Sequence, residues 1–508
     1  MKVLFIPLDE RPCNFNFPQD VVKVRRDIEL VVPEKSLLGD KKTAADTKKL
    51  WEFVFENAVG CDYAVISVDM LVYGGLIPSR LHCLSSEEVG EYIENIKKVK
   101  KFNPNLKIYA FNCIMRSPQY NSAEEEPEYY GAYGYSIFRR AYLMDKRERS
   151  SLSKEEENEF DNIKIPNEII DDYENRREFN LKVNMKVVEL VKEGIIDFLT
   201  IPQDDSCEYG YTAIAQRKVI RFVKENKLEF KVNIYPGADE VACSLLARIL
   251  NNYLNRTVKV YPFYASTLGP TIIPFYEDRP MNESLKYHIR VCGAEIVEDY
   301  KDADLILAIN CPGKKMQEAC EQLTNLDLTF TSHRNLQDFV FRIQKYVNSG
   351  EKVIVCDSAF CNGGDLQLID FMDRLGILDK IIAYAGWNTN CNSLGTVLSS
   401  GIHAFDQKEN QEIIRNIIYR VVEDALYQAN VRDKLTNEFL PKYGMNIFDL
   451  KDKQSEVEKE IRKLLVEEYN KLNISNMYEL NIEKVFLPWK RMFEVGLELS
   501  IVRKELKI

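Results

Sequence analysis

The chain has 508 residues, of which 45% are hydrophobic and 29% are charged. These proportions are typical of a folded globular protein and exclude disordered and collagen-like chains, and the length allows about two to four domains. The net charge of −11 argues against a nucleic-acid-binding protein, because phosphate recognition needs a basic face.

Short apolar runs alternate with longer helical patterns along most of the chain. Several of the runs are apolar without alternation, as expected for parallel strands that are covered on both faces. The predicted strands are residues 3–8, 28–32, 63–68, 106–111, 196–201, 231–235, 258–261, 305–309, 353–356 and 381–384. Helices are predicted at 85–101, 180–194, 213–227 and 239–254, and at 409–431 and 455–470 near the C-terminus.

This rhythm predicts an α/β protein with more strands than one eight-stranded barrel can hold. We expect residues 1–255 to form a (β/α) barrel-like or doubly wound unit, with an insertion at about 124–166. Residues 256–404 are expected to form a second, Rossmann-like α/β unit, and residues 405–508 a helical C-terminal region. A single elaborated barrel is the alternative.

The compartment follows from the first strand and from the cysteines. Residues 3–8 are followed at once by charged residues and by no cleavage site, which is unlike a signal peptide. No apolar run approaches the ~20 residues of a membrane-spanning helix. The twelve cysteines form no CxxC pair and suit a reducing compartment. We therefore expect a cytoplasmic protein with no membrane or nucleic-acid partner.

Polar residues gather after the predicted strands, where ligands bind in parallel α/β folds. An Asp at such a place is often only the N-cap of the next helix, but a helix needs one cap, and several of these strand ends carry two charged groups. Clustered like charges cost stability unless a ligand, a metal or a shared proton relieves them. The candidate binding residues are Asp9, Glu10, Arg11, Asp69, Asn112, Arg116, Asp239, Glu240, Asp357, Asn362, Trp387, Asn388 and Asn392, beside a catalytic pair, Asp204 and Asp205.

The available residue types limit the chemistry. Only four histidines are present, and none follows a strand, which disfavours a Ser-His-Asp triad and a His-rich zinc site. No glycine-rich nucleotide-binding motif occurs. Carboxylates, amides, arginine and aromatic rings suit the recognition of a sugar, and the oxygen ligands equally suit a hard cation.

The adjacent acids Asp204 and Asp205 are the sharpest catalytic candidates. Two neighbouring carboxyl groups should titrate as a coupled pair, one with a raised pKa and one ionised. Glycoside hydrolysis needs such a division between a proton donor and an anion. When the substrate carries an acetamido group, its carbonyl oxygen can be the nucleophile, and adjacent acids then suffice.

Several strings together resemble the bacterial family catalogued as domain of unknown function 4127. They are IPLDERPCN at 6–14, VDMLVYGGLIPSR at 68–80, PQDDSCEYG at 202–210, PGADEVACSLLAR at 236–248 and AGWNTNCNSLGT at 385–396. This resemblance spans about residues 1–500 and implies no activity. The acid pair is also similar to that of the substrate-assisted N-acetylhexosaminidases, an analogy in which Asp204 would orient the acetamide and Asp205 would be the general acid.

These observations favour a retaining, substrate-assisted glycoside hydrolase that acts on N-acetylhexosaminides and binds no metal. The first alternative is a hydrolase or lyase with Mg²⁺ or Mn²⁺ bound by Asp9, Asp69, Asp204 and Asp239. The second alternative is a non-catalytic protein that binds a sugar or another polar metabolite. In each case we expect Asp9, Arg11, Asp69, Asn112, Asp204, Asp205, Asp239 and Glu240 to converge on one concave site.

Overall fold

All ten predicted strands form in the computed structural model, which describes residues 1–408 and 410–504. The described residues divide into two units. Unit 1 consists of Met1–Glu10, Asp27–Leu245 and Tyr276–Arg279. Unit 2 consists of Arg11–Arg26, Leu246–Phe275 and the described residues from Pro280 onward. Each unit therefore combines separate stretches of the chain. The division predicted from the sequence instead consists of continuous segments, with boundaries at residues 255 and 404.

Unit 1 is built on an open, parallel six-stranded sheet with the strand order β2-β1-β3-β4-β5-β6. Because β1 lies between β2 and β3, the first strand cannot meet the last one, and no barrel closes. The doubly wound alternative is therefore the one that forms, and the barrel is not. The strands are β1 (Lys2–Ile6), β2 (Glu29–Val31), β3 (Tyr63–Ser67), β4 (Lys107–Phe111), β5 (Phe198–Gln203) and β6 (Val232–Pro236).

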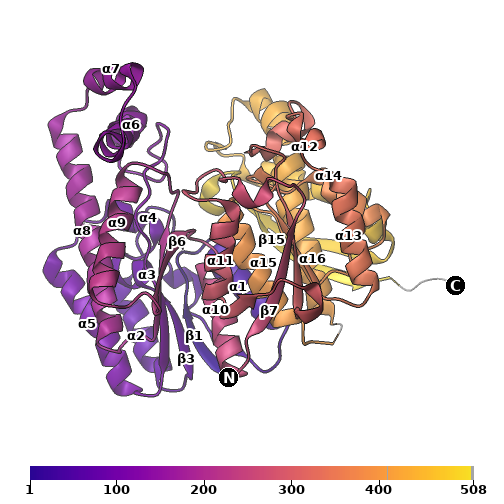
Figure 1. Cartoon of the computed structure of the whole chain (residues 1–508), viewed down its shortest axis with the longest axis horizontal. Coiled ribbons are helices and arrows are strands. Elements are labelled where there is room, and N and C mark those ends of the chain that lie inside the picture. The colour runs from indigo at the N-terminus through magenta and orange to yellow at the C-terminus, as the bar shows by residue number, and fades with distance from the viewer. Residues whose placement is uncertain (409, 505–508) are drawn as a thin grey trace. The chain divides into compact units, whose positions relative to one another are not determined.

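The helices of unit 1 follow from local sequence signals. Ser85 and Glu88 form a capping box at the start of α5. Helix α5 contacts α2 and α8, and α8 in turn contacts α9. The segment 124–166 contains α6 and α7 and no strand, and Figure 1 shows these two helices at one end of the unit, beyond the sheet. The helices are η1 (Lys35–Leu37), α2 (Thr47–Ala58), α3 (Val68–Tyr73), α4 (Leu76–Leu81), α5 (Ser86–Phe102), α6 (Tyr130–Arg149), α7 (Lys154–Asn162), α8 (Asn167–Lys192) and α9 (Tyr211–Glu225).

Unit 2 contains a parallel five-stranded sheet with the order β13-β11-β9-β7-β8. Counted along the chain, this is the same 2-1-3-4-5 order that begins the sheet of unit 1. The small pair β10 and β12 lies outside this sheet. The strands are β7 (Val258–Tyr264), β8 (Ala294–Ile296), β9 (Leu305–Asn310), β10 (Gln317–Glu318), β11 (Val353–Asp357), β12 (Phe360–Cys361) and β13 (Ala383–Ala385).

Helix α15 is buried along almost its whole length, and it packs on β11 and β13. Helices α1 and α11 pack against α15, which explains why residues 11–26 belong to this unit. Helix α10 contains the boundary between the two units. The helices are α1 (Pro12–Lys23), α10 (Val241–Tyr253), η2 (Gly269–Thr271), α11 (Met281–Val291), η3 (Tyr300–Asp302), η4 (Ala319–Leu323), α12 (Thr329–Ser332), α13 (Leu336–Asn348), α14 (Leu366–Arg374) and α15 (Asn390–Ala404).

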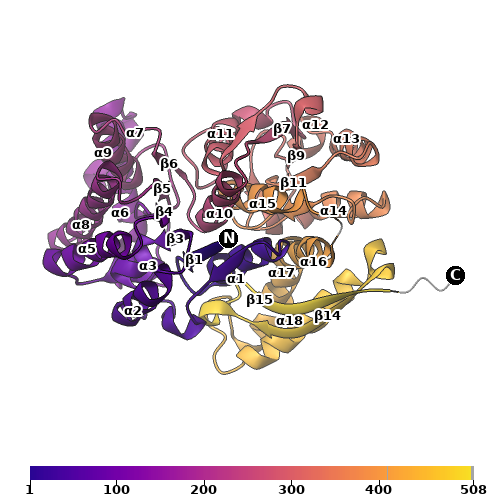
Figure 2. The same ribbon diagram turned by 90° about the horizontal axis from the view of Figure 1, so that it is seen from below.

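The C-terminal region is helical, as predicted, but it ends in an antiparallel ribbon that was not predicted. The ribbon pairs β14 with β15, and Figure 2 shows α18 lying along it. Residue 409, at the start of the predicted helix 409–431, lies outside the described residues. The elements are α16 (Gln411–Arg420), the π-helix η5 (Val421–Val431), α17 (Arg432–Lys434), η6 (Leu435–Phe439), η7 (Leu440–Tyr443), α18 (Gln454–Tyr469), η8 (Asn473–Asn476), β14 (Tyr478–Phe486), η9 (Pro488–Lys490) and β15 (Gly496–Arg503).

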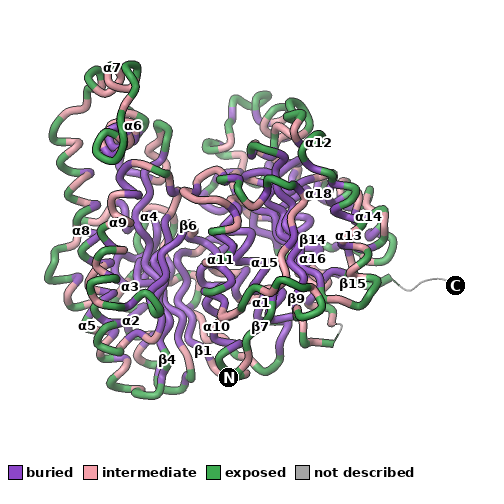
Figure 3. Tube along the Cα trace, in the orientation of Figure 1, coloured by how far each residue is buried: buried purple, intermediate pink, exposed green. Residues whose placement is uncertain are grey.

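The cores lie along the central strands. Every residue of β9 and all but the first residue of β1 are buried, as the purple tube in Figure 3 shows. Strands that are covered on both faces leave the loops at their carboxyl ends as the places where polar groups can meet a ligand.

The packing of α15 on β11 predicts a difference between two helical glycines. A Cβ added at Gly401 would lie 2.7 Å from Ile354 Cγ2, whereas a Cβ added at Gly90 in α5 would meet nothing within 4 Å. We expect Gly401→Ala to lower the free energy of unfolding by about 1–3 kcal/mol through overpacking. Gly90→Ala should raise it by up to about 1 kcal/mol, because alanine favours a helix. Thermal and urea unfolding of both variants measure the difference, and equal effects would contradict the packing argument.

Candidate functional site

The predicted site residues fall into both units. Unit 1 holds Asp9, Glu10, Asp69, Asn112, Arg116, Asp204, Asp205, Asp239 and Glu240. Unit 2 holds Arg11, Asp357, Asn362, Trp387, Asn388 and Asn392. Each unit is therefore described by itself.

A buried arginine binds three carboxylates at the carboxyl end of the sheet in unit 1. Arg80, in α4, is 1% exposed. Its Nη1 donates to Glu125 Oε2 at 3.2 Å and to Glu126 Oε1 at 3.1 Å, and its Nη2 donates to Asp204 Oδ2 at 2.6 Å. The Asp204 carboxylate, one half of the predicted catalytic pair, is thus held in an ion pair.

A second arginine binds the other half of the pair. Arg116 Nη1 donates to Asp205 Oδ2 at 3.0 Å, Nε donates to Glu126 Oε1 at 2.9 Å, and Nη2 donates to Glu125 Oε2 at 2.9 Å. Two guanidinium groups therefore share four carboxylates. The sequence predicts that a ligand, a metal or a shared proton relieves the repulsion between these acids. In the structure the ion pairs with the two arginines relieve it.

Asp205 nevertheless keeps an unusual environment. Its backbone adopts a left-handed conformation with φ of 41°. Burial, reinforced by the charge of Asp204, raises the pKa of the Asp205 carboxyl to about 6. The catalytic roles assigned to this pair from the sequence stay a prediction.

The remaining strand-end acids of unit 1 bind backbone and amide groups nearby. Asp69 accepts hydrogen bonds from Asn112 Nδ2 at 3.1 Å and from the Cys113 amide at 2.9 Å, and burial raises its pKa to about 6. Glu10 accepts from the Lys41 amide, and Glu240 accepts from the Ala238 amide two residues earlier. Asp9 and Asp239 are buried.

In unit 2, Asp357 is the centre of a buried network. Its carboxylate accepts from Asn310 Nδ2, the Asp365 amide and the Tyr384 hydroxyl at 2.8, 2.6 and 2.9 Å. Burial and the charge of Asp365 raise its pKa to about 7. Arg334 completes the network with an ion pair of 2.7 Å to Asp365. Asp357 is 1% exposed, and its hydrogen bonds hold together β9, β13 and the segment before α14.

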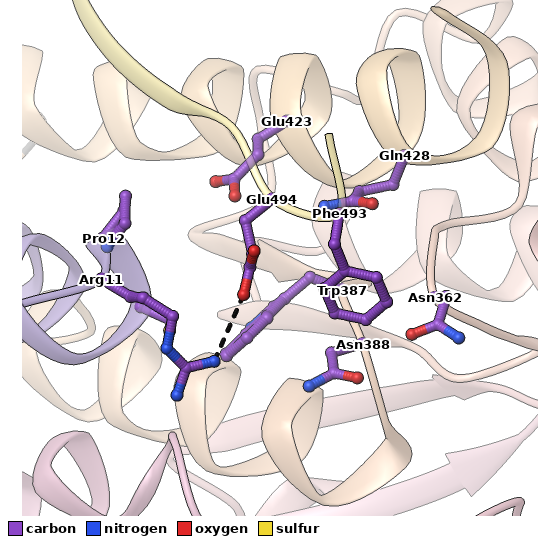
Figure 4. Close-up of a pocket in the computed structure, with 10 residues that line it drawn as sticks. Arg11, Pro12, Asn362, Trp387, Asn388, Glu423, Gln428, Phe493 and Glu494 are labelled. Carbon is purple, nitrogen blue, oxygen red and sulfur yellow. Dashed lines mark hydrogen bonds and ion pairs between the residues drawn. The ribbon is translucent and has the colours of Figure 1, made fainter. Parts of the chain in front are cut away.

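Four of the predicted residues lie together around a pocket of about 370 Å³ in unit 2. Its walls are formed by the loops after β12 and β13, the start of α1, the π-helix η5 and the turn of the C-terminal ribbon. Figure 4 shows the side chains that line it. They are Arg11, Pro12, Cys13, Asn362, Trp387, Asn388, Glu423, Gln428, Phe493 and Glu494.

Glu494 enters the pocket from the ribbon turn and is bound by two arginines. Arg491 donates to its two oxygens at 3.1 and 2.9 Å, and Arg11 Nη1 donates at 3.3 Å (Figure 4). The guanidinium carbons of Arg11 and Arg491 lie 4.6 and 4.5 Å from the centroid of the Trp489 ring. These contacts fix the carboxylate in place.

Glu423 faces the same pocket from η5. It contacts Arg420, which also forms a 3.1 Å ion pair with Asp424. One buried cation thus serves two buried carboxyl groups. Burial raises the pKa of Glu423 to about 8, against the opposing effect of Arg420, and raises the pKa of Asp424 to about 6. Burial therefore favours the protonated form of the Glu423 carboxyl.

Trp387 and two asparagines complete the pocket. Trp387 is 5% exposed, packs edge-on against Phe17 and donates its indole N–H to Thr396, so that only a small part of its ring meets the cavity. Asn362 and Asn388 both have left-handed backbones, with φ of 60° and 52°. Their backbones are joined by a 2.7 Å hydrogen bond, which ties the two loops together.

One family model, described as "Protein of unknown function (DUF4127)", matches residues 3–498. The chain belongs to this DUF4127 family. The match confirms the resemblance predicted from the sequence motifs, and it includes every residue that lines the pocket. No curated protein matches the chain.

Two further observations concern residues 1–408 and 410–504 of this DUF4127 protein. None of their helices combines the length and the apolar character needed to cross a membrane. They also contain no group of three or more His, Cys, Asp or Glu side chains arranged to hold a metal ion. Asp9, Asp69, Asp204 and Asp239, the ligands of the Mg²⁺ or Mn²⁺ alternative, are therefore not such a group.

Sequence reasoning found Arg11, Asn362, Trp387 and Asn388 but missed Glu423, Gln428, Phe493 and Glu494. The site residues were predicted from polar side chains that directly follow parallel strands, and none of the missed residues has such a position. Alternation of apolar and polar residues in β14, where Leu480 and Ile482 are buried, is the sequence signal from which the ribbon could have been predicted.

The ion pairs of unit 1 predict how this DUF4127 protein responds to loss of an arginine. Arg80→Gln leaves the Asp204 carboxylate without its arginine and Glu126 with Arg116 alone, and we expect a loss of about 3–5 kcal/mol in unfolding free energy. Because protonation relieves unpaired carboxylates, the loss should be smaller at pH 5 than at pH 8.

The matched control is Arg139→Gln, which breaks the more exposed pair with Glu159 in the same unit. We expect a cost of about 0–1 kcal/mol for this change. Denaturant unfolding at both pH values measures the two effects. A loss at Arg80 that does not shrink on acidification would contradict the charge argument.

Proposed function

We propose that the chain is a glycoside hydrolase whose reaction centre is the pocket of unit 2. The observation that carries the proposal is the contrast between the two carboxyl groups in that pocket. Burial raises the pKa of Glu423 to about 8, so it holds a proton, whereas Glu494 is bound by Arg11 and Arg491. Glycosidic cleavage needs one acid that gives a proton and one anion that faces the developing positive charge.

The other lining groups are those that recognise sugars. The edge of Trp387 and the ring of Phe493 offer apolar surface, and the amides of Asn362 and Asn388 offer hydrogen bonds to hydroxyl groups. This combination supports a carbohydrate as the substrate.

In the proposed reaction Glu423 gives its proton to the leaving oxygen as the bond between that oxygen and the anomeric carbon breaks. Glu494 stabilises the positive charge on the sugar ring. The oxygen of an incoming water then bonds to the anomeric carbon while one proton of that water passes to the ionised Glu423. Both Glu494 oxygens accept hydrogen bonds from arginines, which makes this group a weak nucleophile. For N-acetylhexosaminides the acetamido oxygen would attack instead, and the reaction would retain configuration.

Asp204 and Asp205 are the rival acid pair, assigned from the sequence. The pKa of about 6 at Asp205 keeps it a possible proton donor, although both carboxylates bind arginines. Because the two candidate acids lie in different units, single substitutions separate them.

We expect Glu423→Gln to lower kcat/KM by about 10²–10⁴-fold on glycosides with poor leaving groups, because the proton donor is lost. Nitrophenyl glycosides, whose leaving group needs little protonation, should be much less affected. The substrates are N-acetyl-β-glucosaminides and N-acetyl-β-galactosaminides with alkyl and nitrophenyl leaving groups, assayed by release of the free sugar.

Two variants make this experiment decisive. Glu438→Gln makes the same substitution at an exposed position in η6 and should leave both rates unchanged. Asp205→Asn should also retain activity. Loss of turnover in Asp205→Asn with retention in Glu423→Gln would move the reaction centre to unit 1. Defects that excess Mg²⁺ or Mn²⁺ repairs would favour the metal-dependent alternative, and sugar binding with no turnover would favour a binding protein.

The raised pKa of Glu423 also predicts the pH dependence. A general acid works only while protonated, so kcat/KM for a poor leaving group should fall about tenfold per pH unit above about pH 8. For a nitrophenyl glycoside the fall should be shallower. A profile for poor leaving groups that falls already above pH 6 would point to Asp205 instead.

We further propose that the protein works in the cytoplasm. All twelve cysteines are free thiols. Free thiols persist in a reducing compartment, whereas oxidising compartments favour disulfides.

A further inference from the structure

Gln428 is a buried polar side chain at the pocket with an unsatisfied acceptor. It lies on η5, lines the cavity and is 6% exposed. Its Oε1 has no hydrogen-bond partner among the described residues. Buried amide oxygens nearly always accept a hydrogen bond, and leaving one unpaired costs stability. A hydrogen-bond donor to Gln428 Oε1 must therefore come from outside the described part of the chain.

The helix geometry brings Gln428 and the proposed acid to the same cavity. In the π-helix η5 each amide bonds to a carbonyl five residues earlier, so residues five apart lie almost above one another. Glu423 and Gln428 are five apart and both line the pocket. In an α-helix, with 3.6 residues per turn, the same two residues would be separated by about 140° around the axis. The wide helix thus brings both side chains to one cavity.

We infer that Gln428 is a substrate-binding residue whose Oε1 accepts a hydrogen bond from one ring substituent of the sugar. The donor is a hydroxyl or the N–H of an acetamido group, and the residue selects substrates that carry such a donor at that position. The inference rests on the proposed function for the identity of the ligand as a sugar. The orphaned oxygen, its burial and its place beside Glu423 support it.

The pairing makes a double-mutant cycle between protein and ligand possible. The probes are thioglycosides of N-acetylglucosamine, N-acetylgalactosamine, glucose and galactose, which resist cleavage. For the tightest of them, a series replaces each donor in turn by fluorine or hydrogen. Binding to the wild type and to Gln428→Met is measured by calorimetry. Methionine keeps the length of the side chain and cannot accept the hydrogen bond in the same way.

We expect one replacement to weaken binding to the wild type by roughly 10–100-fold and to leave binding to Gln428→Met unchanged. Gln428→Met should bind the parent probe more weakly by a similar factor. The ring substituent whose replacement weakens binding identifies the donor to Gln428. It is the N–H if that substituent is the acetamido group and the O–H if it is a hydroxyl. Gln367→Met, at an exposed position in α14, is the control and should bind every probe like the wild type.

The melting temperature gives a second test. A structural glutamine would destabilise the fold when replaced, whereas removal of an unpaired buried acceptor should leave the melting temperature of Gln428→Met equal or higher. Equal losses for every replacement in both proteins, or no binding of any thioglycoside, would overturn the inference. Glu423-dependent hydrolysis without coupling at Gln428 overturns the inference alone. Coupling at Gln428 without hydrolysis overturns the proposed function alone.

Discussion

The pocket of unit 2 depends on one buried cation that must serve two buried acids. Arg420 contacts both Glu423 and Asp424, and burial penalises a second uncompensated negative charge. One proton therefore stays in the group, and the raised pKa of Glu423 follows directly. The same group also holds the pocket wall, because Asp424 accepts the Gly386 amide at 2.8 Å, next to Trp387. Charge state and loop position are thus set by the same interaction.

In unit 1 two arginines offset the same penalty on buried negative charge. Four carboxylates gather there, but Arg80 and Arg116 each bind several of them at once. An arginine can donate five hydrogen bonds in a fixed fork, which lets one guanidinium satisfy acids from different loops. The density of acids at the strand ends of unit 1 is thus explained by internal pairing.

Local patterns were enough to predict all six strands of the sheet in unit 1 and four of the five strands of the parallel sheet in unit 2, because buried parallel strands leave a plain apolar signature. They were also enough for Asn362, Trp387 and Asn388, which follow strands directly. Glu423 and Gln428 could not be placed, because their common face depends on the wide turn of η5, while periodicity assumes 3.6 residues per turn. Glu494 reaches the pocket only through the pairing of β14 with β15, a contact that strand-end reasoning does not consider.

The ion pair between Arg11 and Glu494 joins residues 483 positions apart, and this has a consequence during translation. At about 5–20 residues per second, a ribosome needs roughly 25–100 s to add Glu494 after Arg11. The sheet of unit 2 is complete in sequence long before that, so it can fold while one wall of the pocket is still unmade. A nascent chain, or one released early by a nonsense codon, therefore cannot assemble the pair of contrasting carboxyl groups. The complete wall of the pocket forms only after Glu494 has been added to the chain.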